Sequence, residues 1–108
     1  MNESEYTRLA DTTLRRIEHA LEAADVDLDF ELAAGGILEV GFDNGSRIVI
    51  NKQAAAQEIW VAARNGGFHF RWDGAAWRDT RGGEELFAAL SRLASEQAGS
   101  DISLRGDS

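Results

Sequence analysis

Uncharged, mostly apolar residues near the start of the chain recur at helical spacing. Between residues 2 and 24 they fall three or four positions apart, so they share one face of an amphipathic helix. This stripe consists of Tyr6, Leu9, Ala10, Thr13, Ile17, Ala20, Leu21 and Ala24. Asn2, followed three positions later by Glu5, is typical of a helix N-cap. The pattern predicts a first helix over residues 2–24.

After residue 25 the spacing changes to strict alternation of apolar and polar residues, the pattern of strands with one buried face. The expected strands cover residues 26–32, 37–42, 47–52, 58–64, 68–72 and 77–79. In the first of them, the residues expected to face the core are Val26, Leu28, Phe30 and Leu32. Asn44 and Gly45, between two alternating runs, predict a hairpin with a type I′ turn.

Residues 53–64, with the sequence QAAAQEIWVAAR, have two interpretations. Their Ala, Gln and Glu residues have high helix propensity. However, Ile59 and Val61 alternate with Trp60, which favours a strand that pairs with residues 68–72. In that case Trp60 stands on the opposite face from Ile59 and Val61, exposed on the open side of the sheet, where a Trp is typical of a protein-contact residue. For Trp72 and Trp77 we expect core packing.

Helical spacing returns over residues 84–97. Its inward residues are Leu86, Leu90, Leu93 and Ala94, and Glu84 and Glu85 occupy its first turn. We expect Ile102 and Leu104 to pack back on the body. This order of elements predicts a single α+β domain over residues 1–108: a two-layer α/β sandwich, with two terminal helices packed on one face of a five- to six-stranded antiparallel sheet. The other face of the sheet must meet water.

The negative charge of the chain is concentrated in one segment. The 108 residues include 11 Lys and Arg and 19 Asp and Glu, a net charge of −8. Eight of the acids lie between Arg16 and Arg47 with no Lys or Arg among them, and the remaining acids equal the bases in number. Such a local field repels nucleic acid and anionic membranes and attracts cations or basic protein surfaces.

We call the six carboxylates of residues 18–31 the acidic ridge: Glu18, Glu22, Asp25, Asp27, Asp29 and Glu31. The first three have helical spacing, and the others alternate along the expected strand. A solvated surface is the ordinary explanation of a charge run. Like-charge repulsion of about 0.2–0.5 kcal/mol per pair, without any interleaved cation, weakens that explanation here. Carboxylates suit Fe, Mn, Mg or Ca. Carboxylates two residues apart on one strand lie about 6.6–7 Å from each other along the chain, which is too far for one compact metal cage. We therefore expect weak, open, multi-site binding.

Other kinds of chemistry have little support. The chain has no Cys, which excludes disulfides and thiolate chemistry, and it lacks the motifs of nucleotide binding and of a nucleophile elbow. Its acidic N-terminus and the lack of a long apolar run predict a soluble cytoplasmic protein. The only histidines are His19, which either extends the ridge or is an exposed helix residue, and His69, expected on the open face in a contact role.

The chain resembles the bacterial frataxin family. The most specific segments are NKQ at 51–53, QEIWVAA at 57–63 and GGFHF at 66–70, joined by GGILEVGFDNGSRIVI at 35–50. The resemblance extends over nearly the whole chain. It implies an α–β–α order with both helices on one face of an antiparallel sheet, and it decides residues 53–64 in favour of a loop and a strand.

The resemblance also implies a function: a non-enzymatic role in iron–sulfur cluster assembly, with docking on and regulation of the cysteine desulfurase and contact with the scaffold protein. It assigns weak Fe(II) and Fe(III) binding to the acidic ridge, with other divalent cations as further ligands. The partner-binding residues that we expect are Glu18, Glu22, Asp25, Asn51, Gln53, Trp60 and His69. We expect a monomer and leave iron-dependent oligomers open.

Two other functions stay open at this point. One is a ferroxidase or iron-storage protein that oligomerises around iron, although the sequence has no Glu-x-x-His di-iron motif of the ferritin type. The other is an acidic domain that binds Ca²⁺.

Overall fold

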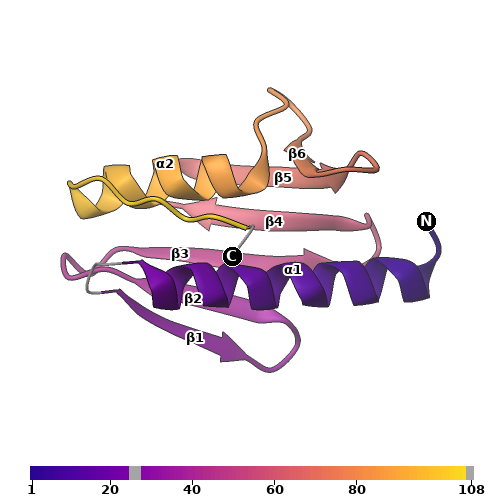
Figure 1. Cartoon of the computed structure of the whole chain (residues 1–108), viewed down its shortest axis with the longest axis horizontal. Helices are drawn as coiled ribbons and strands as arrows, with labels where there is room; N and C mark the ends of the chain where they lie inside the picture. Colours follow the sequence, from indigo (N-terminus) through magenta and orange to yellow (C-terminus); the bar gives the residue numbers. More distant parts are fainter. Residues whose placement is uncertain (25–27, 107–108) are drawn as a thin grey trace.

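In the described part of the computed structural model, six antiparallel strands follow one another between two helices (Figure 1). The structure describes residues 1–24 and 28–106. Its elements are α1 (Glu3–Ala23), β1 (Asp29–Ala33), β2 (Ile37–Gly41), β3 (Arg47–Gln53), β4 (Glu58–Ala63), β5 (Gly66–Trp72), β6 (Trp77–Asp79) and α2 (Leu86–Ala98). The spatial order of the strands is their order in the sequence. The predicted α+β fold is confirmed, and residues 53–64 form a loop and a strand.

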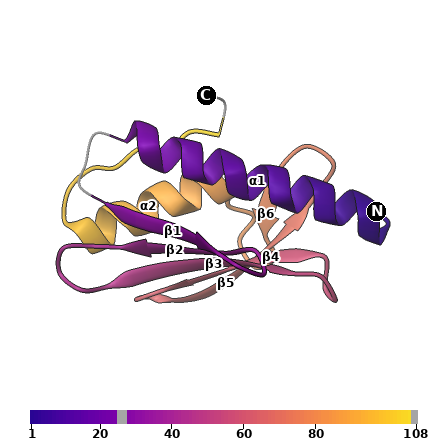
Figure 2. The same cartoon turned by 90° about the horizontal axis from the view of Figure 1, so that it is seen from below.

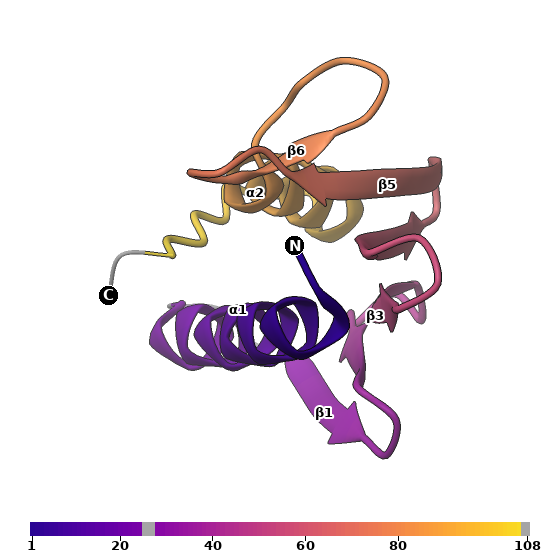
Figure 3. The ribbon, with the colours of Figure 1, turned by 90° about the vertical axis from the view of Figure 1, so that its right-hand side faces the viewer.

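Both helices lie on the same face of the sheet, as the predicted two-layer sandwich requires (Figure 2 and Figure 3). Helix α1 runs over the side of the sheet that contains β1 to β3, and α2 over the side with β5 and β6. The core lies between these layers. Among its buried side chains are Leu38, Ile50, Ile59, Phe70 and Leu90. Ile102 and Leu104 of the tail are buried too, as predicted, so the layer of helices and tail covers one face of the sheet and leaves the other open.

The apolar stripe of α1 is buried as the spacing predicts, except that Leu9 and Ala24 are only partly buried, and Leu14, which lay outside the predicted stripe, is buried too. Both ends of the helix lie within one residue of the predicted bounds. At its N-terminus the Asn2 side chain accepts a hydrogen bond from the backbone N–H of Glu5 (2.8 Å). This satisfies one of the helix's unpaired N–H groups. In the described part of the chain, neither helix is long and apolar enough to span a membrane.

Tyr6 is the only tyrosine of the chain, and its ring is buried under α1 with 1% of its surface exposed. Its hydroxyl donates a hydrogen bond to the backbone carbonyl oxygen of Glu58 (2.7 Å). Burial raises the pKa of Tyr6 above its ordinary value of 10.0. The neutral phenol is therefore the form that the folded protein favours.

This raised pKa predicts a loss of stability at alkaline pH. Because the folded pKa lies above the unfolded one, the stabilisation is complete below about pH 10 and is lost as pH rises through the folded pKa. We expect tyrosinate absorbance to appear only above the ordinary pKa, together with loss of the helical circular dichroism signal. In Tyr6→Phe this contribution to the pH dependence should vanish. An ordinary tyrosine titration in a protein that stays folded would contradict the prediction.

The two tryptophans predicted for the core differ in burial. Trp77 is 3% exposed, and its Nε1 donates a hydrogen bond to Oγ1 of Thr13 on α1 (2.9 Å). Trp72 is only half-buried and packs edge-on against Trp77, with ring centroids 5.6 Å apart. Trp72 ends β5 and pairs with the short edge strand β6, so it is less enclosed than a residue of an inner strand.

The strand predicted over residues 26–32 is β1, which begins at Asp29; Val26 lies outside the described residues. Phe30 is partly buried against the core, as expected. The inward position predicted for Leu32 is wrong, because 43% of Leu32 is exposed. Among the described strands β1 pairs only with β2, at the edge of the sheet, so its side chains are less enclosed than those of β2 to β5.

The turn between β2 and β3 is not the predicted type I′ turn. That turn needs positive φ at both central residues, and among the described residues Gln57 is the only non-glycine residue with positive φ. Instead, the N–H of Gly45 donates to the carbonyl oxygen of Phe42 (2.9 Å), and the N–H of Phe42 donates to that of Ser46 (3.0 Å). Residues 43–45 thus form a three-residue loop that ends in Gly45 with φ of 86°.

Helix α2 begins at Leu86, two residues later than predicted. Glu85 precedes the helix as its N-cap, and its carboxylate accepts hydrogen bonds from the N–H groups of Phe87 (2.9 Å) and Ala88 (3.1 Å). An acidic residue at this end of a helix also interacts favourably with the helix dipole. The capping carboxylate therefore sets the start of α2.

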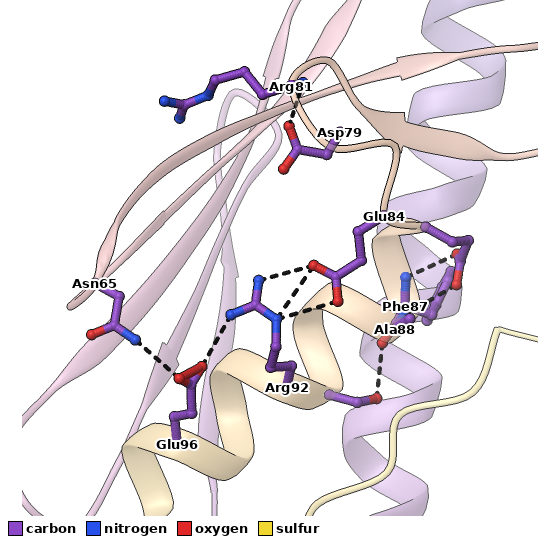
Figure 4. A network of polar contacts seen from close by, with 10 residues as sticks. Asn65, Asp79, Arg81, Glu84, Phe87, Ala88, Arg92 and Glu96 are labelled. Carbon is purple, nitrogen blue, oxygen red and sulfur yellow. Dashed lines mark hydrogen bonds and ion pairs between the residues drawn. The ribbon is translucent and has the colours of Figure 1, made fainter.

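Around α2, an exposed polar network joins the helix to the sheet (Figure 4). The guanidinium of Arg92 donates to the carboxylates of Glu84 (2.9 Å) and Glu96 (3.1 Å). Glu96 in turn accepts a hydrogen bond from Nδ2 of Asn65, in the turn between β4 and β5 (3.3 Å). The charges of Glu84, just before α2, and of Glu96, within it, are thus compensated by Arg92.

Candidate functional site

The first candidate region is the acidic ridge. Four of its six carboxylates lie in the described part of the chain, on α1 and β1: Glu18, Glu22, Asp29 and Glu31. All of these are exposed except Glu18, which is half-buried. Within residues 1–24 and 28–106, no salt bridge involves any of them. Asp25 and Asp27 lie outside the described residues. The neighbouring His19 is exposed on α1.

By contrast, an acid elsewhere on α1 is paired. The carboxylate of Asp11 lies 2.5 Å from the ammonium nitrogen of Lys52 on β3. Lys52 is itself mostly buried, with 21% of its side chain exposed, so this pair links α1 to the sheet. The described carboxylates of the acidic ridge have no such partner among the described residues, and their charge is available to ligands in solvent.

Strand register places a further carboxylate beside the ridge. Glu31 on β1 is directly opposite Glu39 on β2. Glu39 is half-buried and lies 3.4 Å from the guanidinium of Arg47 on β3. Together with Asp29, these side chains line an open hollow of about 350 Å³. The sequence shows Glu39 as part of the acidic segment, but its position opposite Glu31 depends on the pairing of β1 with β2.

The described carboxylates do not form a compact metal site. No group of three His, Asp or Glu residues in the described part of the chain is close enough to hold a metal ion. Carboxylate oxygens are nevertheless ligands that Fe(II), Fe(III) and other hard cations accept. The chemistry of the donors fits iron, while their spacing on α1 and β1 provides no closed cage among the described residues.

The two ends of α1 allow a test of the charge of the ridge. Glu22 lies in the last turn, where a carboxylate opposes the helix dipole, and Glu3 lies in the first turn, where it is favourable. We expect Glu22→Gln to raise the free energy of unfolding by about 0.3–1 kcal/mol and Glu3→Gln to lower it by a similar amount. Urea unfolding at low salt measures both, and added salt should shrink both differences. Equal responses of the two variants would contradict this account.

The second candidate region lies on the open face of the sheet. We call Asn51, Gln53, Trp60 and His69 the Trp60 cluster. Asn51 on β3 is directly opposite Trp60 on β4, which is directly opposite His69 on β5. The alternate positions on these strands are buried under the helices: Ile50, Ile59, Val61 and Phe70. The side chains of the cluster therefore face away from the helices, as the alternation predicts.

Trp60 is half-buried, not fully exposed as predicted. Its indole stacks on the imidazole of His69, with ring centroids 4.2 Å apart and planes 7° from parallel. This stack covers one side of the indole. The His69 side chain is 47% exposed, which agrees with its predicted place on the open face. The pair forms a flat aromatic surface on the open face of the sheet.

Beside this stack lies a small hollow of about 140 Å³, lined in part by Asn51, Ala62 and Gly67. The side-chain oxygen of Asn51 is itself buried, and it has no hydrogen-bond partner among the described residues. A buried acceptor without a donor is uncommon and costs about 1–3 kcal/mol.

Glu58 is a member of this region that the sequence does not indicate. It lies on the open face at the start of β4, yet only 5% of it is exposed. Its carboxylate contacts Arg71 (2.6 Å) and the indole N–H of Trp60 (2.8 Å). In the sequence Glu58 follows Gln57 at the end of an alanine-rich loop, and its burial depends on its neighbours in space. The burial of Glu58 could be predicted only from the strand register, which brings Arg71 beside it.

The comparisons with known proteins decide the family. The frataxin-like domain family matches residues 1–100. The chain belongs to the frataxin family. The iron-sulfur cluster assembly protein CyaY of Dechloromonas aromatica is 61% identical over 105 residues, which cover 97% of this chain and 100% of that protein. Its counterpart in Cupriavidus taiwanensis is 56% identical over 106 residues, with 95% and 96% covered. The resemblance seen in the sequence is confirmed.

Solved structures of the frataxin family share the fold. Frataxin from Psychromonas ingrahamii matches with a TM-score of 0.87 at 30% identity, over 95% of this chain and 97% of that one. A trimeric frataxin from the yeast Saccharomyces cerevisiae, complexed with ferrous iron, matches with a TM-score of 0.65 at 25% identity, over 93% and 88%. These matches concern whole chains, so the roles of the acidic ridge and the Trp60 cluster stay predictions.

Proposed function

We propose that this frataxin-family member is an iron-binding protein of iron–sulfur cluster assembly that docks on the cysteine desulfurase and regulates it, without being an enzyme itself. The acidic ridge meets a basic surface of the desulfurase, and the Trp60 cluster contacts the assembled partners, including the scaffold protein. Support comes from the relatives named for iron–sulfur cluster assembly. The observation that carries the proposal is the set of carboxylates on α1 and β1 without a salt bridge in the described part of the chain.

Iron is cargo in this proposal. Oxygen ligands spread over α1 and β1, with no group of three close enough for a metal among the described residues, hold a cation through few protein atoms, with water completing its coordination. Such binding is weak and exchanges readily, as delivery or sensing requires. The yeast relative complexed with ferrous iron supports this choice of metal. Fe(III) and other divalent cations satisfy the same ligand chemistry.

Docking follows from the same charges. Unpaired surface carboxylates steer a basic partner into encounter, and they affect the association rate more than the final affinity. A half-buried tryptophan on the open face of the sheet is the kind of residue that supplies affinity after encounter. In this proposal the acidic ridge speeds association, and the Trp60 cluster supplies affinity once the partners have met.

The test is a calorimetric titration of a bacterial cysteine desulfurase with this chain at low salt, with and without Fe(II). The proposal expects a saturable complex. No complex in either condition would contradict it.

A second candidate, iron storage or ferroxidase activity, is favoured by one observation: the yeast relative is a trimer complexed with ferrous iron. Aerobic Fe(II) oxidation followed together with light scattering separates the two functions. Our proposal expects a monomer and the same oxidation rate as in buffer. Catalysed oxidation with growth of large assemblies would establish storage instead.

A further inference from the structure

Among the described residues, Glu58 is the only charged residue that is buried. It lies on the open face of the sheet, where an acidic side chain could reach water, so the core does not require its burial. A carboxylate that loses its hydration needs hydrogen-bond donors in return. The position of Glu58 is therefore determined by its donors.

The two carboxylate oxygens of Glu58 serve different neighbours. Oε2 accepts from the guanidinium of Arg71, directly opposite on β5 (2.6 Å). Oε1 accepts from the indole Nε1 of Trp60 (2.8 Å) and lies 3.8 Å from Nδ1 of His69. Arg71 is 65% exposed, whereas the Glu58 side chain is 7% exposed. The guanidinium thus covers the carboxylate from the solvent side while the carboxylate holds the indole.

These contacts restrict Trp60 to one orientation. Stacking on His69 fixes the plane of the indole. A flat ring that flips over and returns to the same plane would still be stacked, however, so stacking alone leaves two orientations. The hydrogen bond to Glu58 removes this freedom, because only one orientation points Nε1 at the carboxylate. Fixing a side chain before binding reduces the conformational entropy that this side chain loses on association.

We infer that Glu58 is a positioning residue: it holds Trp60 in the orientation in which the Trp60 cluster meets the docking partner, and Arg71 holds Glu58. This inference rests on the proposed docking role of Trp60. Glu58 itself is covered by its neighbours and does not touch the partner. The pair of acceptors is specific to a carboxylate, because a glutamine in its place has one oxygen for two donors.

The experiment compares Glu58→Ala, Glu58→Gln, Arg71→Ala and the double variant Glu58→Gln with Arg71→Ala. Each is measured for affinity to the desulfurase and for the indole N–H signals of the three tryptophans by NMR, with Trp60→Phe identifying the Trp60 signal. We expect Glu58→Ala to shift the Trp60 signal, to speed its exchange with water and to weaken docking about threefold to tenfold, the effect of one lost hydrogen bond. The signals of Trp72 and Trp77 should not move.

The amide variants separate positioning from simple stabilisation. In Glu58→Gln the amide oxygen is shared between Arg71 and Trp60, so we expect an intermediate effect. Removing Arg71 as well frees that oxygen for the indole, and the double variant should match Arg71→Ala in both the Trp60 signal and affinity. If the pair merely stabilises the hairpin, the double variant will have a lower melting temperature, and its Trp60 signal and its affinity will not match those of Arg71→Ala. That outcome overturns the inference.

Trp60→Ala distinguishes the failure of this inference from the failure of the proposed function. If Trp60→Ala weakens docking while Glu58→Ala leaves both docking and the Trp60 signal unchanged, the positioning role is wrong and the docking role of Trp60 stands. If Trp60→Ala leaves docking unchanged, the proposed docking role of Trp60 is wrong, and the positioning role of Glu58 in docking is wrong with it.

Discussion

Neutralising the acidic ridge should slow association with the desulfurase about tenfold or more at low salt, which is the scale of electrostatic steering. The variant is Glu22→Gln, Asp29→Asn and Glu31→Gln, three exposed carboxylates without a salt bridge in the described part of the chain. For wild type the association rate should fall steeply with added salt, because the Debye length shrinks from about 10 Å at 0.1 M to about 3 Å at 1 M. Stopped-flow mixing measures both effects.

The matched control removes the same amount of charge from other surfaces: Glu3→Gln, Glu5→Gln and Asp101→Asn, all exposed in the wild type. Both triple variants change the net charge equally, so a long-range effect of total charge would slow them alike. We expect the control to retain most of the wild-type rate. Equal slowing of the two variants would show that net charge, and not the ridge, guides docking.

Truncating Trp60 should weaken partner binding by about 2 kcal/mol or more, close to thirtyfold, as for a hot-spot residue. Its effect on folding should be much smaller. Trp60 is half-buried, and its truncation removes one stacked contact and one hydrogen bond from the folded protein, each worth about 0.5–1.5 kcal/mol. Trp60→Ala is tested by calorimetric titration and by urea unfolding.

Trp77 is the control for this prediction. It is 3% exposed and packs between the sheet and α1, so Trp77→Ala should destabilise by about 3–5 kcal/mol, the usual loss for a core Trp. If Trp60→Ala destabilises the protein as much as Trp77→Ala does, Trp60 is a core residue and its assignment to the open face is wrong.

Much of the fold follows from periodicity. The stripe of α1 and the alternation of β2 to β5 state directly which residues face the core, because a buried helix face repeats every three or four residues and a strand face every two. The same alternation places Trp60 and His69 on the open face. Where burial is nearly complete, as at Ile17 and Phe70, the pattern and the structure agree.

The errors occur where enclosure depends on neighbours in space. Leu32 follows the alternation but lies on an edge strand, so its burial is incomplete. Glu58 departs from expectation in the opposite sense: it is polar and lies on the open face, as the alternation requires, yet it is buried because Arg71 and Trp60 close over it. Both outcomes depend on strand order and register, which the composition of a single segment does not contain.

The central claim is that iron and the desulfurase use the same acidic ridge. It is tested most directly by two paired titrations: the affinity for desulfurase with and without Fe(II), and the affinity for Fe(II) with and without desulfurase. Linkage requires that both affinities change by one common factor. That factor lies below one if iron neutralises carboxylates that the desulfurase needs, and above one if the desulfurase supplies further ligands. The account predicts a factor that differs from one; no change in either titration would contradict it, because the two sites would then be energetically separate.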